Sequence, residues 1–345
     1  MIMIEFYQYF GYFISVFFLF FVPFYFLTQS VCKYFPYLFN NKVNLKAKPG
    51  SWAVITGCTS GIGLEFAREL GRRGYNLWLI SRTEDNLSRV ASSIRTKYPQ
   101  CERIITTPFD FNSTDYRTLD QVIQEIPSIT ILVNNIGTVG TDDSLPEYFI
   151  VQPKEILTKI INVNIFSCVH LTYLVLEKMK PQTGIIINVS AIFATHGAPL
   201  WAAGGSSKGF IDTFARCLDK ECSEKDIRVC SLLTAGVQTR RVPFKENLTI
   251  PSASSYVKSV LKTVQYNKQY TGFWTHELFL VMLKWMPIFS LWSNSEDYFS
   301  TKMYAKVRHE LYAKHKRPVT YGGPQDFPND LMSIMIQSFG VVKVE

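Results

Sequence analysis

The chain has 345 residues, of which 47% are apolar and 19% charged, and a formal net charge of +8. This length and composition suit one long α/β domain with appended segments. The basic residues form no stripe with interleaved aromatic side chains, which argues against a nucleic-acid-binding protein. They gather after the first apolar segment and near the C-terminus, as expected beside an anionic membrane face. The seven cysteines are scattered without CxxC spacing, which argues against a disulfide framework or a zinc site and favours a reducing compartment.

The N-terminal stretch predicts a membrane anchor. Residues 6–32 contain no charged side chain, and these 27 residues would span about 40 Å as a helix, more than the ~30 Å hydrocarbon layer of a bilayer. A cleaved signal peptide is the alternative, but a basic leading region and an A-x-A cleavage site are missing. Lysines follow the segment and none precede it, which favours a lumenal N-terminus and a cytosolic domain. We therefore expect residues 1–48 to form a single-span anchor and linker.

Short β-branched runs alternate with helical patterns after Pro49-Gly50. The predicted strands are 51–57, 76–81, 103–110, 130–135, 184–190 and 226–234. The predicted helices run from the first strand to about 72, then over 84–97, 115–126, 155–180 and 203–223. This alternation is typical of βαβ units, and it predicts a parallel sheet covered by helices on both faces.

Two further segments complete the predicted organisation. Residues 275–295 are strongly apolar but are interrupted by Lys284 and Pro287, which favours a substrate lid or an interfacial helix. Plain core or a re-entrant segment is the alternative. We assign 49–300 to the α/β domain, including this lid, and 301–345 to a basic C-terminal tail.

The segment TGCTSGIG, residues 56–63, lies between the first predicted strand and helix. Its glycines at 57, 61 and 63 allow the backbone to turn sharply and to approach a pyrophosphate, while the helix N-terminus supplies amide donors. A glycine-rich turn without a ligand is the alternative interpretation. The motif predicts a dinucleotide site.

The ends of the next strands favour NADP(H) over NAD(H). The second strand ends in Ser81-Arg82, where an NAD site needs a carboxylate, and Arg82 can bind a 2′-phosphate instead. A solvated surface charge is the alternative role for Arg82. Asp110 closes the third strand, where its carboxylate can meet the adenine amino group. Asn135 and Gly137 follow the fourth strand, where the backbone must approach the cofactor closely.

Together these motifs resemble the short-chain dehydrogenase/reductase superfamily over about residues 50–300. The predicted anchor, the INVN run at 161–164 and the segment TGFWTHEL at 271–278 narrow the resemblance. They are similar to the membrane-bound 17β-hydroxysteroid dehydrogenase and very-long-chain 3-oxoacyl-CoA reductase branch, including its hydroxysteroid-dehydrogenase-like members regarded as inactive. The resemblance implies a Rossmann-type doubly wound parallel sheet of seven strands, NADP(H) as cofactor, and location in the endoplasmic reticulum membrane. The cofactor-binding residues it implies are Gly57, Ser60, Gly61, Ile62, Gly63, Ser81, Arg82, Asp110, Asn135, Gly137 and Lys208.

The resemblance also implies a catalytic set, of which this chain has only half. The family uses a tyrosine as general acid, a lysine four residues later, a serine thirteen residues before the tyrosine and an asparagine on an earlier helix. Lys208 and Asn164 match the lysine and the asparagine. The tyrosine position is Gly204 and the serine position is Ala191. A proton-handling pair is therefore missing.

A shift in alignment does not restore this pair. Ser190 lies one residue early, so its side chain faces the other side of the strand, and Tyr173 belongs to a different helix. His196 and Ser206 lie near Gly204, and His196 stays open as an alternative acid. The segment LLTAGVQT, 232–239, also departs from the family, which has proline near Thr234 and Ala235.

We therefore expect a membrane-anchored NADP(H)-binding protein that is catalytically impaired or inactive. The alternative is an active NADP(H)-dependent oxidoreductase that reduces steroid or long-chain 3-oxoacyl-CoA ketones with an unrecognised acid. A structural partner that binds no nucleotide is a third class. The expected partners are a lipophilic small molecule (a steroid or a long-chain acyl-CoA), membrane lipid and a second copy in a homodimer, because relatives pair through the helices containing Asn164 and Lys208. No metal or nucleic acid is expected.

Overall fold

A computed structural model of the chain describes residues 45–281 except 140–146, 180–183, 241, 243 and 265–267, together with separate residues between 9 and 28. The chain divides between Lys42 and Val43 into two compact units. In the first unit, the described residues between 9 and 28 are helical, and their aromatic side chains are exposed, by 76% at Tyr9 and 62% at Phe20. Most of the predicted anchor, most of the predicted lid and the whole predicted tail lie outside the described residues.

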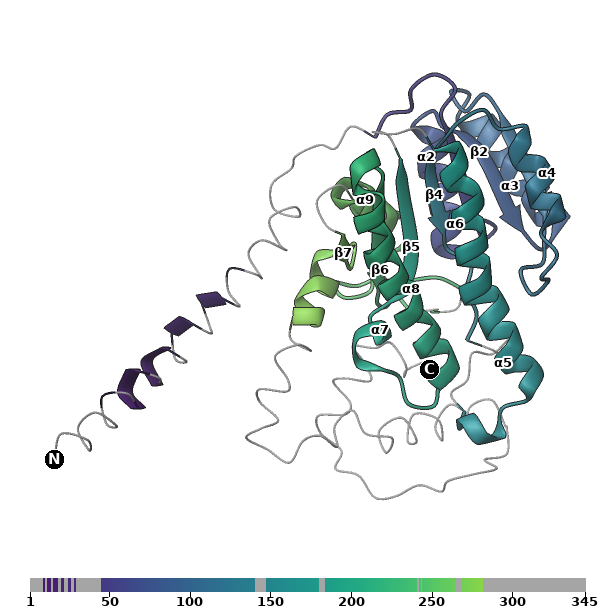
Figure 1. The fold of residues 1–345 in the computed structure, drawn as a ribbon. Coiled ribbons are helices and arrows are strands. Elements are labelled where there is room, and N and C mark those ends of the chain that lie inside the picture. The colour runs from purple at the N-terminus through teal and green to yellow at the C-terminus, as the bar shows by residue number, and fades with distance from the viewer. Residues whose placement is uncertain are drawn as a thin grey trace. The chain divides into compact units, whose positions relative to one another are not determined.

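The described part of the second unit contains a seven-stranded parallel sheet (Figure 1). The strands lie side by side in the order β3 (Ile104–Pro108), β2 (Asn76–Ser81), β1 (Trp52–Thr56), β4 (Ile129–Asn134), β5 (Ile185–Ala191), β6 (Arg228–Thr234) and β7 (Gln269–Tyr270). The order runs outward in both directions from β1 and β4. The doubly wound Rossmann-type sheet predicted from the sequence is confirmed.

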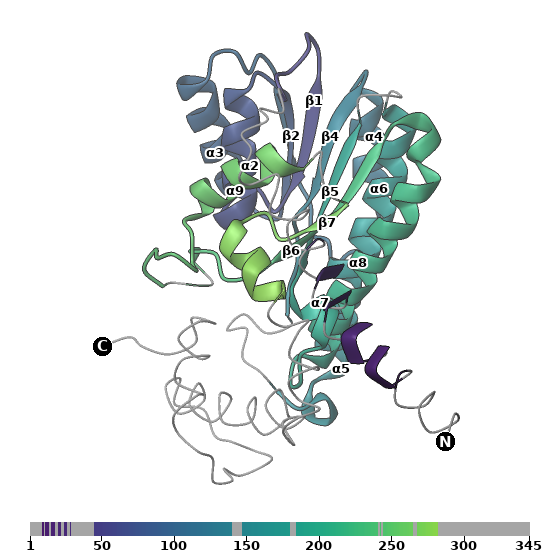
Figure 2. The ribbon, with the colours of Figure 1, turned by 90° about the vertical axis from the view of Figure 1, so that its left-hand side faces the viewer.

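Helices cover both faces of this sheet (Figure 2). One face carries α2 (Gly61–Arg72), α3 (Glu84–Lys97) and α9 (Ala253–Thr263), and the other carries α4 (Arg117–Gln124), α6 (Ser167–Lys178) and α8 (Ala202–Glu221). The shorter helical elements are η1 (Phe149–Val151), α5 (Lys154–Ile160), the π-helix η2 (Ile161–Phe166), α7 (Phe193–His196) and η3 (Ser223–Lys225). Successive residues of β1 face opposite cores, with Ala53 and Ile55 against the first set of helices and Trp52 and Val54 against the second. Burial on both faces explains why the strands are almost wholly apolar.

Helix α9, strand β7 and the short helices η1, α7 and η3 were not predicted from the sequence. The start of α9 has a sequence signal, because serine is a preferred N-cap residue and Ser252 is the N-cap of this helix. Its side chain accepts a hydrogen bond from the backbone amide of Ser255. Strand β7 has only two residues, Gln269 and Tyr270, too few for any alternation of apolar and polar residues to appear.

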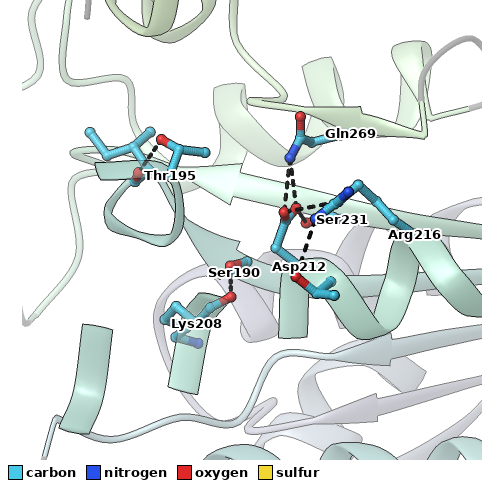
Figure 3. A network of polar contacts seen from close by, with 9 residues as sticks. Ser190, Thr195, Lys208, Asp212, Arg216, Ser231 and Gln269 are labelled. Atoms are coloured by element: carbon cyan, nitrogen blue, oxygen red, sulfur yellow. Dashed lines mark hydrogen bonds and ion pairs between the residues drawn. The ribbon is translucent and has the colours of Figure 1, made fainter. Parts of the chain in front are cut away.

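A buried carboxylate holds strand β7 against the rest of the sheet (Figure 3). Asp212 of α8 is only 5% exposed. Its carboxylate accepts hydrogen bonds from the Ser231 hydroxyl of β6 at 2.5 Å and from the Gln269 amide of β7 at 2.9 Å, and Arg216 pairs with it at 3.2 Å. Because the charge is both buried and paired, this contact fixes the edge strand and the chain that leaves it.

One helix among the described residues is long and apolar enough to cross a membrane. It runs from Lys154 to Lys178 through α5, η2 and α6. However, 44% of its most apolar window is buried, and Leu171 and Val175 pack in the core below the sheet. Packing against the sheet therefore explains part of its apolar character.

Candidate functional site

The strand order of the sheet reverses between β1 and β4. In doubly wound sheets, ligands bind in the crevice outside the carboxyl ends of the strands at this point. The two strand ends are tied together, because the Asn135 side-chain amide donates to the carbonyl oxygen of Thr56 at 3.0 Å. In return, the Thr56 hydroxyl accepts from the backbone amide of Asn135 at 2.9 Å. The side-chain nitrogen of Asn135 therefore serves to hold the two strand ends together.

The glycine-rich turn after β1 has the shape of an anion cradle. Gly57 and Gly61 have φ angles of +62° and +55°, which favour glycine. A Cβ on Gly63 would lie 2.3 Å from the carbonyl oxygen of Gly57, so only glycine lets α2 approach the turn this closely. Helix α2 has no acidic residue in its first turn, Ser60 at its N-cap is exposed, and Ile62 packs against the core. The helix N-terminus is therefore open to a negatively charged ligand.

The end of β2 supplies a hydroxyl and a guanidinium but no carboxylate. Ser81 is buried, and its hydroxyl lies 3.1 Å from the hydroxyl of Thr59 in the glycine-rich turn. Arg82 is exposed, and within the described residues it has no hydrogen-bond or ion-pair partner. Asp110, beyond β3, is also exposed, and its Oδ1 accepts from the backbone amide of Asn112 at 3.0 Å. These residues fit a cofactor that carries a 2′-phosphate.

Lys208, Asn164 and Gly137 meet beside the same crevice, although they come from α8, η2 and the segment after β4. The Lys208 ammonium donates to the carbonyl oxygen of Val189 at 2.9 Å. A Cβ on Gly137 would lie 3.1 Å from Nζ of Lys208 and 3.6 Å from Oδ1 of Asn164. Gly137 therefore allows the backbone to pass directly over the lysine and the asparagine.

The Asn164 side chain holds this arrangement together with three hydrogen bonds. It is 1% exposed. Its Oδ1 accepts from the backbone amide of Thr138 at 2.7 Å, and its Nδ2 donates to the carbonyl oxygen of Thr138 at 2.8 Å and to the Ser207 hydroxyl at 2.7 Å. The π-helical turn over Ile161–Phe166 carries this residue, and such turns are frequent at functional sites.

The sequence analysis predicts Gly204 and Ala191 at the tyrosine and serine positions, and they lie in α8 and at the end of β5. Gly204 is buried one helical turn before Lys208, and a Cβ there would lie 3.5 Å from Cα and Cγ1 of Val139, an ordinary contact. Ala191 ends β5 and pairs with Thr234 of β6. Neither residue has a side chain that can exchange a proton.

The neighbouring polar groups do not replace them. The Ser190 hydroxyl donates to the carbonyl oxygen of Lys208 at 2.7 Å (Figure 3), and Tyr173 is 65% exposed on α6. The side chain of His196 lies outside the described residues, so its predicted role as an alternative acid stays a prediction.

The structure adds three residues that sequence reasoning missed: Val139 opposite Gly204, Ser207 beside Asn164, and Thr239. The segment after β6 crosses the glycine-rich turn, because a Cβ on Gly61 would lie 3.2 Å from Cγ2 of Thr239. The only sequence signal for Thr239 is its place in the segment 232–239, which departs from the family pattern.

The cysteines near the site are inert. Burial raises the pKa of the Cys58 thiol, in the glycine-rich turn, to about 12. Burial raises the pKa of Cys168 likewise to about 12, although the Lys208 ammonium opposes the shift. Both thiols stay protonated near neutral pH and cannot act as nucleophiles.

Comparison with known proteins agrees with this geometry. The sequence profile of the short chain dehydrogenase family matches residues 51–247. The very-long-chain 3-oxoacyl-CoA reductase of Mus musculus is 35% identical over 260 residues, which cover 71% of this chain and 80% of the mouse protein. Hydroxysteroid dehydrogenase-like protein 1 of Gallus gallus is 33% identical over 264 residues, covering 75% of this chain and 78% of the chicken protein.

The chain belongs to the short-chain dehydrogenase family. It falls in the branch of the very-long-chain 3-oxoacyl-CoA reductases and the hydroxysteroid dehydrogenase-like proteins, as the sequence motifs predicted. The NADPH complex of a short-chain dehydrogenase from Sphingobium yanoikuyae has the same fold, with a TM-score of 0.56 and 22% identity over 64% of this chain and 87% of that one.

In this short-chain dehydrogenase the cover of the site is apolar. Ile192, Leu233 and Leu280 form a buried cluster beside the carboxyl ends of β5 and β6. The partly buried residues packed against it are Phe193, Ala194, Ala235 and Phe279. Residues 274–281 are helical, and 275–281 are the described start of the predicted lid. They supply Leu280 and Phe279 to this cluster. A ligand that enters beside Ala191 therefore meets hydrocarbon.

A buried histidine fixes this cover to the dehydrogenase domain. His276 is 2% exposed, and its Nε2 lies 3.0 Å from the carbonyl oxygen of Thr249. Burial lowers the pKa of His276 to about 4, although hydrogen bonds to backbone groups of Thr249 and Gly236 oppose the shift. The neutral ring is therefore part of the folded state.

The free energy of unfolding should fall as the pH is lowered from about 6.5 to about 4. In this window the unfolded chain protonates His276 and the folded chain does not, which costs up to about 3 kcal/mol. Urea unfolding of the full chain in detergent, at a series of pH values, measures the slope. His276→Gln supplies an amide donor but cannot titrate, so its free energy of unfolding should fall by about 3 kcal/mol less over this pH range. Equal slopes would contradict this role of His276.

Proposed function

We propose that this short-chain dehydrogenase binds NADP(H) but lacks ordinary reductase activity. The pyrophosphate would lie on the glycine-rich turn, at Gly57 and the residues from Ser60 to Gly63. The 2′-phosphate would meet Ser81 and Arg82, and the adenine would meet Asp110. Backbone at Asn135 and Gly137 would approach the nicotinamide end, where Lys208 would hold the ribose. The open N-terminus of α2 and the guanidinium of Arg82, which has no partner among the described residues, support this assignment.

The observation that carries the proposal is the pair Gly204 and Ala191. Bound NADPH supplies a hydride, but the ketone oxygen must also receive a proton and a hydrogen bond. Gly204 stands one turn before Lys208, where a phenol is needed, and Ala191 stands where a hydroxyl is needed. Losing a positioned general acid costs about 10²–10⁴ in rate, and losing an oxyanion donor about 10²–10³, although the two are not additive. Even the smallest of these losses leaves a poor reductase.

The apolar cover beside Ala191 supports a lipophilic ligand, either a steroid or a long-chain acyl-CoA. The relatives named as very-long-chain 3-oxoacyl-CoA reductases act on long acyl chains. The proposal is that such a ligand binds next to NADP(H) without being turned over at an ordinary rate.

The proposal includes membrane attachment and pairing. The uncharged segment 6–32, whose described aromatic side chains are exposed, would be a single N-terminal span in the endoplasmic reticulum membrane, with the dehydrogenase domain in the cytosol and membrane lipid around the span. Two copies would pair through α6 and α8, where Tyr173 and Phe210 are 65% and 41% exposed.

An active reductase is the second candidate. The intact contact between Lys208, Asn164 and Gly137 favours it, as do the names of the reductase relatives. It requires an acid other than a residue at position 204.

An assay of NADPH binding and turnover separates the two candidates. It uses the full chain in detergent with NADPH and a panel of ketosteroids and 3-oxoacyl-CoA thioesters. A change in NADPH fluorescence on binding, with no turnover, is expected. Turnover that Lys208→Ala abolishes would establish the reductase. Absence of NADPH binding would overturn both candidates in favour of a structural role.

A further inference from the structure

A groove opens at the amino ends of the strands, at the opposite end of the sheet from the glycine-rich turn. Its walls come from the segments at the amino ends of β1, β2, β4, β5, β6 and β7 and from the last turn of α8 and the start of η3. The groove is therefore built entirely within the second unit. Four basic residues line it: Lys46, Lys48, Arg228 and Lys268. None of the residues assigned to the cofactor belongs to it.

The charge of this groove is positive. Two acidic residues, Asp219 and Asp226, also line it. The Asp219 carboxylate is buried and already used, since it pairs with the Lys268 ammonium at 2.7 Å and accepts from the backbone amide of Val229 at 3.1 Å. The Lys268 side chain is nevertheless 59% exposed, and Lys46 and Lys48 are exposed as well. The groove therefore presents three exposed lysines on flexible stems to solvent, beside one exposed carboxylate, that of Asp226.

The position of these cations in the chain indicates what they meet. The twelve residues 33–44 separate the end of the uncharged segment 6–32 from Leu45, where the groove begins. A chain of this length reaches at most about 40 Å when fully extended. The chain therefore limits how far Lys46 and Lys48 can lie from the membrane surface that the segment would enter, to about 40 Å.

We propose that this basic groove contacts the anionic headgroups of the membrane to which the chain is anchored. The inference rests on the proposed N-terminal anchor. Exposed lysines that converge from separate segments suit many headgroup contacts at a bilayer surface. A single enclosed phosphate would instead require buried donors that point at one place. Each basic residue that reaches an anionic surface strengthens association about fivefold.

Hydrogen exchange of the full chain in lipid nanodiscs tests this proposal. Nanodiscs of phosphatidylcholine alone are compared with nanodiscs containing about one third phosphatidylserine. Peptides covering residues 45–52 and 226–230 should exchange about tenfold more slowly with phosphatidylserine. Lys46→Glu combined with Lys48→Glu should remove this protection. The matched control, Lys154→Glu with Lys245→Glu, reverses two exposed lysines outside the groove and should keep it.

Equal exchange in the two lipids, or loss of protection in the control pair as well, would overturn the proposal. The same protection by glycerophosphoserine in solution would also overturn it, in favour of a small-anion site. Release of the protein from membranes by alkaline carbonate would instead contradict the proposed anchor, and it is scored separately from the exchange rates.

Discussion

Gly204→Tyr combined with Ala191→Ser should raise NADPH-dependent ketone reduction at least about 100-fold. The tyrosine would stand one helical turn before Lys208, whose ammonium already lies beside the crevice. The phenol would then supply the missing proton, and the serine would bind the ketone oxygen. Single-turnover oxidation of NADPH by the full chain, with ketosteroid and 3-oxoacyl-CoA substrates, measures the gain.

The structure indicates how the tyrosine must be accommodated. A Cβ at position 204 makes only ordinary contacts, at 3.5 Å, but they are with Val139, which lies in the direction the ring would take. Val139→Ala added to the double substitution should therefore increase the gain further. A matched control is Gly209→Ala on the same helix, where a Cβ would lie 3.7 Å from the carbonyl oxygen of Ala194, and it should not change the rate. Lys208→Ala should cancel the gain.

No gain in a folded variant that still binds NADPH would count against the placement of the tyrosine and serine positions. Ready turnover by the unchanged chain would contradict the proposal in a different way, because it would require another acid. The Tyr256 hydroxyl does not offer one, since it is fully buried and donates to the carbonyl oxygen of Thr271 at 2.7 Å.

The retained residues do not by themselves indicate catalysis. The nitrogen and the oxygen of the Asn164 amide both bond to Thr138, and the nitrogen also bonds to Ser207. The Ser190 hydroxyl holds the backbone of α8. Replacing such groups would leave buried polar atoms unpaired, at a cost of about 1–3 kcal/mol each. Fold stability alone is therefore a sufficient reason for Asn164 to be present, whereas Gly204 and Ala191 carry no comparable structural demand for a hydroxyl.

Local patterns in the sequence were enough to predict most of the sheet. The expected strand over 76–81 and helix over 84–97 have the same bounds as β2 and α3, because apolar strand runs and helix periodicity are local signals. The glycine spacing in 56–63 likewise predicted the turn before α2. Strand β7 was not predictable in this way, since Asp212 and Ser231, distant in sequence, hold it in place.

The contacts within the candidate site depend on residues far apart in the chain. Asn164 bonds to Thr138, 26 positions earlier, and to Ser207, 43 positions later. No single-sequence pattern specifies such pairs. The family resemblance pointed to Asn164 and Lys208, but it gave no indication that Val139 lies against Gly204 or that Thr239 crosses Gly61.

Arg82→Gln should weaken NADPH binding about 10- to 100-fold and leave NADH binding nearly unchanged, because charge-assisted hydrogen bonds contribute about 1.5–3 kcal/mol. Arg82 is exposed at the end of β2, and within the described residues it has no protein partner, so its guanidinium is available to a 2′-phosphate. Titration of the full chain with each nucleotide, followed by fluorescence, measures both affinities.

The matched control is Arg89→Gln, since Arg89 is also exposed but bonds to Asn86 within α3. An equal loss for both nucleotides would mean that the substitution disturbs the glycine-rich turn, and no loss for NADPH would assign Arg82 to the solvated surface. Rising salt should narrow the preference for NADPH in the unchanged chain and not in the variant, because screening acts on the phosphate contact.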